Sequence, residues 1–201
     1  MYVLGKRSYY VIKIAVAHLR FVTKLPAQID AFAVPTYLLP MAVDPNSLSL
    51  RLVGPEDEQF LFTVYASSRS NELESLGWNA DQIREFLQMQ YAAQERFLES
   101  EYRRADDRII MMNGEPVGRL LVERRDHEIR CIDVALLPQF RNRGIGSRLF
   151  AQLQSESSRT GKPLRIQVIR FSPAVALFER LGFVRTSETG THFQMEWQVE
   201  P

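Results

Sequence analysis

The segment from Ile129 to Phe150 constrains the fold of this chain most strongly. It runs IRCIDVALLPQFRNRGIGSRLF, which predicts a buried strand, a proline that ends it, a basic turn with glycines, and the start of an amphipathic helix. Backbone N–H groups in such a turn, together with the positive dipole end of the helix behind it, favour an anion. The segment therefore predicts a phosphate-binding site.

The spacing of this turn excludes two familiar phosphate loops. A Walker-type loop ends in Gly-Lys-Ser/Thr, whereas this turn ends in the residues GIGSR, Gly144 to Arg148. A dinucleotide-binding loop has a third glycine three residues after the second, and Leu149 occupies that position. Neither nucleotide hydrolysis nor a Rossmann domain is expected.

Two motifs instead resemble those of a known family. Arg141 to Gly146 has the form Arg-x-x-Gly-x-Gly after a strand that ends in Leu-Pro, which resembles the acyl-CoA loop of the GNAT superfamily of acetyl-CoA-dependent N-acetyltransferases. Residues 172–183, SPAVALFERLGF, are similar to the family's second signature. Ser172 there replaces the usual asparagine and Phe178 the usual tyrosine. The resemblance covers Ser47 to Trp197.

The resemblance implies how acetyl-CoA, the co-substrate, is held. Backbone groups near Leu136 would pair with the pantetheine arm, and the amides of the turn would surround the pyrophosphate. The candidate residues are Leu136, Arg141, Arg143, Gly144, Ile145, Gly146, Ser147, Arg148, Ser172 and Phe178. A tight turn alone would explain the glycines, but three neighbouring arginines would repel one another without an anion. A solvated basic turn would explain any single arginine.

Acetyl transfer to an amine requires a proton acceptor, because an amine of pKa near 10.4 is almost entirely protonated at neutral pH. Asp133 is the only carboxylate in its apolar strand, and Glu123 on the neighbouring strand is a second candidate. Strand alternation predicts Cys131, Asp133 and Ala135 on one face, with Val134 on the other. The alternative for Asp133 is an ordinary cross-strand ion pair with Arg119.

Phe178 raises the question of what protonates the departing sulfur. In the family pattern a tyrosine hydroxyl can do so, and phenylalanine has no proton to donate. Because a thiol has a pKa of about 8.5, the thiolate is a tolerable leaving group, and a slower or water-assisted enzyme is expected. A non-catalytic acyl-CoA-binding module and a regulatory domain for another nucleotide are the alternatives. Ser172 is expected to be a helix N-cap, with its hydroxyl available to face the coenzyme.

Composition bounds the remaining properties. The 201 residues are 45% hydrophobic with a formal net charge of +1, so we expect one domain that binds neither nucleic acid nor membrane. A single cysteine, Cys131, favours a reducing, cytoplasmic location, and three dispersed histidines predict no metal site. The acceptor is a small-molecule or peptide amine that the sequence does not name, and both a monomer and a homodimer remain open.

The order of predicted elements gives an α/β domain with a mixed, mostly antiparallel sheet flanked by helices. Residues 1–45 form an N-terminal extension or leader, predicted to be irregular, and 46–201 form the N-acetyltransferase domain. Strand patterns cover residues 48–52, 108–112, 117–123, 129–137, 164–169 and the end of the chain. Helices are predicted after Pro55, Asn79, Gly144 and Ser172. Trp78, Tyr91 and the acidic residues Glu72, Glu74 and Glu85 lie where the family usually builds its acceptor pocket.

Overall fold

The fold is taken from a computed structural model, which describes residues 47–69, 73 and 77–198. The predicted N-terminal extension and the residues Glu72 and Glu74 lie outside this range. Seven strands follow the chain in the order β1 (Leu48–Leu52), β2 (Asp106–Met112), β3 (Glu115–Arg124), β4 (Ile129–Leu136), β5 (Leu164–Ile169), β6 (Val184–Glu188) and β7 (His192–Trp197). The helices are α1 (Glu58–Ser67), α3 (Ala80–Glu101), α4 (Ile145–Thr160) and α5 (Ala174–Arg180), with 3-10 turns η1 (Pro55–Asp57) and η3 (Pro138–Phe140).

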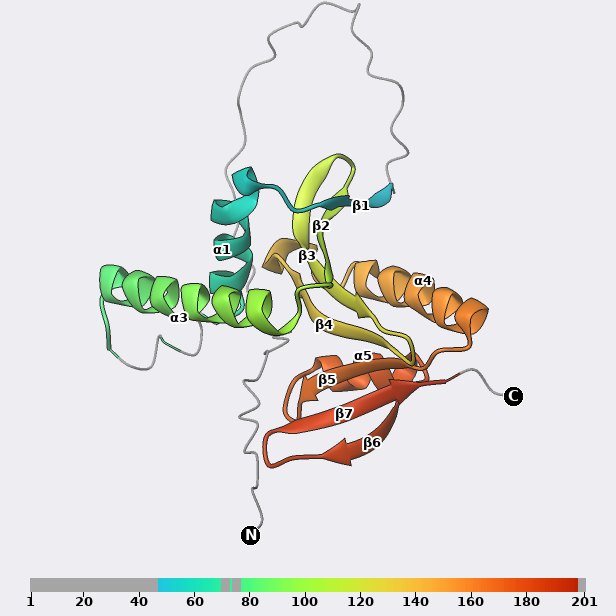
Figure 1. Cartoon of the computed structure of the whole chain (residues 1–201). Coiled ribbons are helices and arrows are strands. Elements are labelled where there is room, and N and C mark those ends of the chain that lie inside the picture. The colour runs from blue at the N-terminus through green and yellow to red at the C-terminus, as the bar shows by residue number, and fades with distance from the viewer. Residues whose placement is uncertain (1–46, 70–72, 74–76, 199–201) are drawn as a thin grey trace, which may run out of the picture.

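All seven strands form one sheet in the order β1-β2-β3-β4-β5-β7-β6. Every neighbouring pair is antiparallel except β4 and β5, which are parallel and are joined through α4. Figure 1 shows β5, β7 and β6 turning away from the four strands that precede them. The predicted α/β domain with a mixed, mostly antiparallel sheet is confirmed.

Helices cover both faces of this sheet. One core contains Ile110 of β2 with the apolar residues of α4 and α5, among them Leu149, Phe150 and Phe178. The adjacent residue Ile109 belongs to a second core with α1 and α3. Because neighbouring strand residues point to opposite faces, α4 and α5 pack on one face and α1 and α3 on the other (Figure 1).

Two local predictions are confirmed by backbone geometry. In the β2–β3 hairpin, Asn113 and Gly114 have φ angles of 53° and 82°, as a tight turn of that type requires. Helix α3 begins with the expected capping box, in which the Asn79 side chain accepts from Gln82 N at 2.9 Å and the Gln82 side chain accepts from Asn79 N at 3.0 Å.

The start of α5 differs from the prediction. Pro173, not Ser172, is the N-cap, and the helix begins at Ala174. The Ser172 hydroxyl still accepts a hydrogen bond from Ala174 N at 3.2 Å. Ser172 therefore supports the turn before the helix from one position further out than expected.

A β-bulge in β4 overturns the predicted alternation of side chains. Leu121 pairs with Asp133 and Val122 with Cys131, so Ile132 is the extra residue. Cys131 consequently packs in the same core as Val134, whereas Asp133 faces the α1 side of the sheet. The prediction that Cys131 and Asp133 share a face is wrong because simple alternation does not continue through a bulge.

No helix in the part of the chain that the structure describes is both long enough and apolar enough to cross a membrane.

Candidate active site

A large cavity lies where the two parallel strands separate. Pairing between β4 and β5 ends at Cys131 and Ile166, although both strands continue beyond that point. A cavity of about 510 Å³ opens there, lined by β4, the turn after it, the start of α4, and α5. Its volume falls within the usual range for small-molecule sites.

Backbone groups of β4 face this gap. Leu137 N donates to Val117 O on β3 at 2.9 Å, and backbone groups point to alternate sides along a strand. The backbone groups of Leu136 therefore point toward the gap, where the Leu136 carbonyl accepts from Arg141 Nε at 2.8 Å. The Leu136 N–H also points toward the gap, where it can donate a hydrogen bond to a molecule in the cavity.

The turn before α4 presents a second row of donors. Asn142 and Gly144 have φ angles of 59° and 77°, and Gly144 is the N-cap without any side-chain cap. Successive N–H groups in such a turn form a concave anion-binding surface. Ile145, Gly146 and Ser147 line the cavity. The first hydrogen bond within the helix is donated by Arg148 N to Gly144 O at 3.0 Å. The amides before it are available to an anion.

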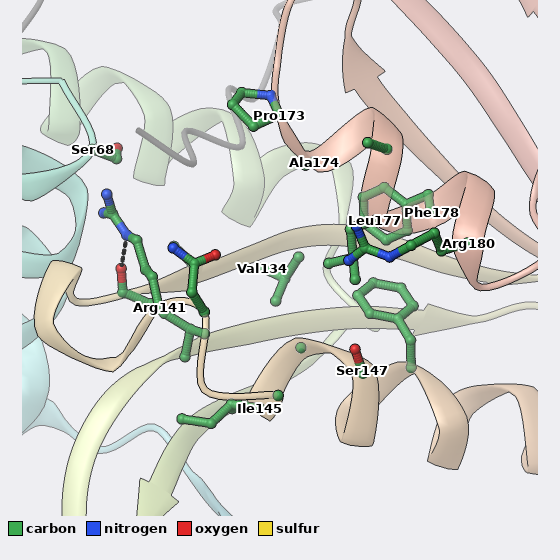
Figure 2. A pocket seen from close by; sticks show the side chains of 17 residues that line it. Ser68, Val134, Arg141, Ile145, Ser147, Pro173, Ala174, Leu177, Phe178 and Arg180 are labelled. Carbon is green, nitrogen blue, oxygen red and sulfur yellow. Dashed lines mark hydrogen bonds between the residues drawn. The ribbon is translucent and has the colours of Figure 1, made fainter. Parts of the chain in front are cut away.

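Arg141 is the predicted arginine that enters the cavity. Figure 2 shows its side chain beside Ser68, with the hydrogen bond to the Leu136 carbonyl. Its Nη2 also lies 3.5 Å from the carbonyl and the hydroxyl oxygen of Ser67 at the end of α1. Burial lowers the pKa of this guanidinium, yet arginine stays charged at neutral pH. Arg141 therefore supplies positive charge and links β4 to α1.

The other basic residues are placed differently. Arg143 and Arg148 are exposed and do not line the cavity, and the Arg143 guanidinium lies 5.5 Å from the ring centre of Phe140. Ser172 is also absent from the lining. Arg180, to which the sequence assigned no role, does line it from the last turn of α5 (Figure 2). Helical spacing from Leu177, which also lines the cavity, would have placed it there.

Phe178 lies between the cavity and the core. It is 1% exposed, and its ring contacts those of Phe150 and Phe183 edge-on, with centroids 4.8 and 5.4 Å apart. Figure 2 shows it over the start of α4 beside Leu177. An aromatic residue at this position therefore has a packing role that does not need a hydroxyl group.

Asp133 lies in a small adjoining cavity on the α1 side of the sheet. This cavity is about 20 Å³, enough for a single water, and it shares the residues Ser68 and Ala135 with the large one. Asp133 is 7% exposed, and burial raises the pKa of its carboxyl above the ordinary value. A buried carboxylate of raised pKa next to a ligand cavity is suited to accept a proton.

The expected ion pair between Arg119 and Asp133 is wrong. Arg119 pairs in register with Ala135, and its guanidinium binds Asp107 and Glu95, with closest contacts of 2.6 Å to each. The sequence did not indicate these partners, because Glu95 lies on α3, 24 residues before Arg119 in the chain.

Glu123 lies apart from both cavities. It is opposite Arg130, toward the other end of β3, and is ion-paired with Arg125 at 2.5 Å. Arg125 also binds Glu128, which is 1% exposed and contacts Arg130 and Arg165 as well. Glu123 thus belongs to a network that joins strands, and of the two candidate bases only Asp133 lines either cavity.

No cluster of three or more potential metal ligands occurs among residues 47–69, 73 and 77–198.

Comparison with known proteins identifies the fold. Residues 105–185 match the family model described as the acetyltransferase (GNAT) domain. No curated protein matches the chain in sequence. The PaiA N-acetyltransferase of Thermoplasma acidophilum, solved in complex with coenzyme A, is similar with a TM-score of 0.58 and 16% identity over 76% of this chain and 99% of that one.

Two further structures show the same fold. The ribosomal-protein-S18-alanine N-acetyltransferase of Escherichia coli has a TM-score of 0.55 and 16% identity, covering 77% of this chain and 96% of that one. A GNAT family acetyltransferase of Elizabethkingia anophelis with acetyl-CoA bound has a TM-score of 0.52 and 15% identity, covering 78% and 100%. Residues 105–185 thus match the GNAT acetyltransferase domain, and the described part of the chain has the fold of the N-acetyltransferases compared above.

Proposed function

We propose that the protein transfers an acetyl group from acetyl-CoA directly to a primary amine of a small molecule or a peptide. The observation that carries the proposal is the arrangement of the two cavities. A row of amide donors and a half-buried arginine, Arg141, line the larger cavity, and a buried carboxylate lies in the smaller one beyond Ser68 and Ala135. This arrangement suits an anionic thioester on one side and a protonated amine on the other.

The residues present fit acetyl-CoA. The free amides at the start of α4 and the Arg141 guanidinium would hold the pyrophosphate. The Leu136 N–H would donate to the pantetheine arm, which would lie along β4 where β5 has separated from it. Leu177 and Phe178 supply an apolar wall. When bound there, acetyl-CoA supplies an activated acetyl group as a thioester.

Asp133 would accept the proton that the acceptor amine must lose. Its burial disfavours the charged form, so the carboxylate is a stronger base than an exposed aspartate. The 20 Å³ cavity beside it has room for a water that could carry the proton from the amine. The resulting neutral amine attacks the thioester carbonyl and a C–N bond forms. The C–S bond breaks with the sulfur leaving as thiolate, and the proton that the nitrogen loses as it becomes an amide passes to this thiolate through water.

Phe178 leaves the protonation of the thiolate to water. Because a thiol has a pKa of about 8.5, the thiolate leaves without a dedicated acid at a moderate cost in rate. The same residue favours a second candidate function, a non-catalytic acyl-CoA-binding module, because the position carries no proton donor.

Release of coenzyme A thiol in the presence of a panel of amines tests the proposal. Polyamines, amino acids, aminoglycosides and peptides with a free N-terminus or lysine cover the main amine classes. Amine-dependent thiol release that is lost in Asp133→Asn would support the enzyme. Saturable acetyl-CoA binding without thiol release from any amine would favour the binding module, and the absence of acetyl-CoA binding would refute both.

A further inference from the structure

Asp133 has an arginine within reach that it does not bind. Leu121 of β3 pairs in register with Asp107 on β2 and with Asp133 on β4. Arg119 lies two residues before Leu121 on the same strand, so it is a diagonal neighbour of both aspartates. A long side chain can span such a diagonal. Arg119 therefore has one carboxylate available on each side and binds only the one on β2.

Hydrogen bonds to Asp107 and to Glu95 of α3 explain why Arg119 does not bind Asp133. Its Nε and Nη2 donate to the two Asp107 oxygens at 2.9 and 2.6 Å, and its Nη1 and Nη2 donate to the two Glu95 oxygens at 2.6 and 3.0 Å. These bonds use four of the five N–H groups of a guanidinium. Glu95 comes from α3, and together with Asp107 it holds the guanidinium on their side of β3.

The remaining surroundings of Asp133 come from α1, from the residues just after it, and from α3. Tyr65 of α1, Arg69 and Gln94 of α3 line the same 20 Å³ cavity. The Arg69 guanidinium lies 3.7 Å from the Tyr65 ring centre and donates to Gln94 at 3.1 Å. The charged groups around Asp133 are thus Arg69 from the segment after α1, Glu95 from α3, Asp107 from β2 and Arg119 from β3.

We propose that Glu95 and Asp107 are positioning residues for the acetyl-transfer reaction: by holding the Arg119 guanidinium between them, they prevent it from pairing with Asp133 and so preserve Asp133 as a proton acceptor. The inference rests on the proposed role of Asp133. An arginine paired with Asp133 would stabilise its ionised form and weaken it as a base. Burial has the largest effect on the Asp133 carboxyl and favours its protonated form; the positive charges of Arg119 and Arg69 act against it, and the negative charges of Glu95 and Asp107 add to it.

The test removes one carboxylate at a time without changing its shape. Glu95→Gln and Asp107→Asn both weaken the hold on Arg119 and remove a negative charge near Asp133. Their side chains are 23% and 28% exposed, so the substitutions need not disrupt a packed core. Glu156→Gln is the matched control, because Glu156 binds Arg124 through both of its oxygens at 2.6 and 2.9 Å beside α4, away from the two cavities.

The first measurement is the titration of the Asp133 carboxyl carbon by 13C NMR, assigned with Asp133→Asn. We expect the midpoint to fall by about one pH unit or more in Glu95→Gln and in Asp107→Asn, and to stay unchanged in Glu156→Gln. The acidic limb of the kcat/KM profile should move to lower pH by the same amount. An unchanged Asp133 titration in both folded variants would overturn the proposal, as would an equal shift in the control.

Failure of the proposed function gives a different result. If Asp133 is not the base, Asp133→Asn keeps the wild-type pH profile, while the NMR midpoint still reports whether Glu95 and Asp107 hold Arg119 away from it. A shifted midpoint with an unshifted kcat/KM limb would overturn the positioning role in catalysis. A shift in both would support it.

Discussion

Gly118→Ala should disturb the strand that the two cavities share. Gly118 of β3 pairs with Leu136, and a Cβ built on it would lie 2.2 Å from the Ala135 carbonyl oxygen and 2.8 Å from Leu136 Cδ2. Because Cβ atoms do not approach other atoms closer than 3.0 Å, β4 must move away from β3 by most of an ångström. Overpacking of this kind costs about 1–3 kcal/mol in free energy of unfolding.

The matched control is Gly190→Ala, because no atom lies within 4 Å of a Cβ at Gly190. Replacing glycine by alanine also restricts the unfolded chain, which favours folding by about 0.4–1 kcal/mol where the native backbone permits it. Urea unfolding should therefore show Gly118→Ala less stable than wild type and Gly190→Ala equal to it or slightly more stable. Equal unfolding free energies for the two variants would refute the reasoning.

The same substitution should weaken the site as well as the fold. Ala135 and Leu136 line the large cavity, and Ala135 also lines the one that holds Asp133. A displacement near 1 Å can lower a catalytic rate by about 100-fold. Calorimetric titration of Gly118→Ala with acetyl-CoA, at a temperature where the variant is folded, should show weaker binding than Gly190→Ala.

Five single substitutions have further expected outcomes. Asp133→Asn should lower the acetylation rate and flatten its rise with pH. It should also increase stability at pH 7 in urea unfolding, because a carboxyl of raised folded-state pKa favours folding below its unfolded-state pKa and loses that contribution as pH rises through the folded value. Glu128→Gln should lower the free energy of unfolding by about 3–5 kcal/mol at neutral pH. Because the folded-state pKa of Glu128 is lowered to about 2, the wild-type carboxylate stabilises the fold above pH 4.5, and acid unfolding should show this stabilisation disappear as pH falls toward 2. Arg141→Met should weaken acetyl-CoA binding in calorimetry by at least tenfold, about 1.4 kcal/mol, and Arg143→Met much less, because only Arg141 lines the cavity. Phe178→Tyr should raise kcat by less than tenfold in the thiol-release assay, because the thiolate is already a tolerable leaving group.

Local chemistry allowed much of the fold to be predicted. The capping box at Asn79, the positive φ angles at Asn113 and Gly114, and the turn before α4 each depend on residues close together in the sequence. The position of the 510 Å³ cavity followed from the same turn, because unpaired amides at a helix start belong to the helix itself.

Features that depend on distant residues could not be predicted in this way. The bulge at Ile132 depends on how β4 pairs with β3. Only this bulge places Asp133 and Cys131 on opposite faces of the sheet. The partners of Arg119 include Glu95, which reaches it from a helix 24 residues earlier in the chain. Alternation along a single strand contains neither piece of information.

The contact between Arg141 and Ser67 joins the two cavities. Arg141, in the turn before α4, touches the end of α1, and the next residue of that end, Ser68, lines both cavities. A molecule in either cavity therefore affects the same C-terminal end of α1. By thermodynamic linkage, any factor by which acetyl-CoA strengthens amine binding is also the factor by which the amine strengthens retention of acetyl-CoA.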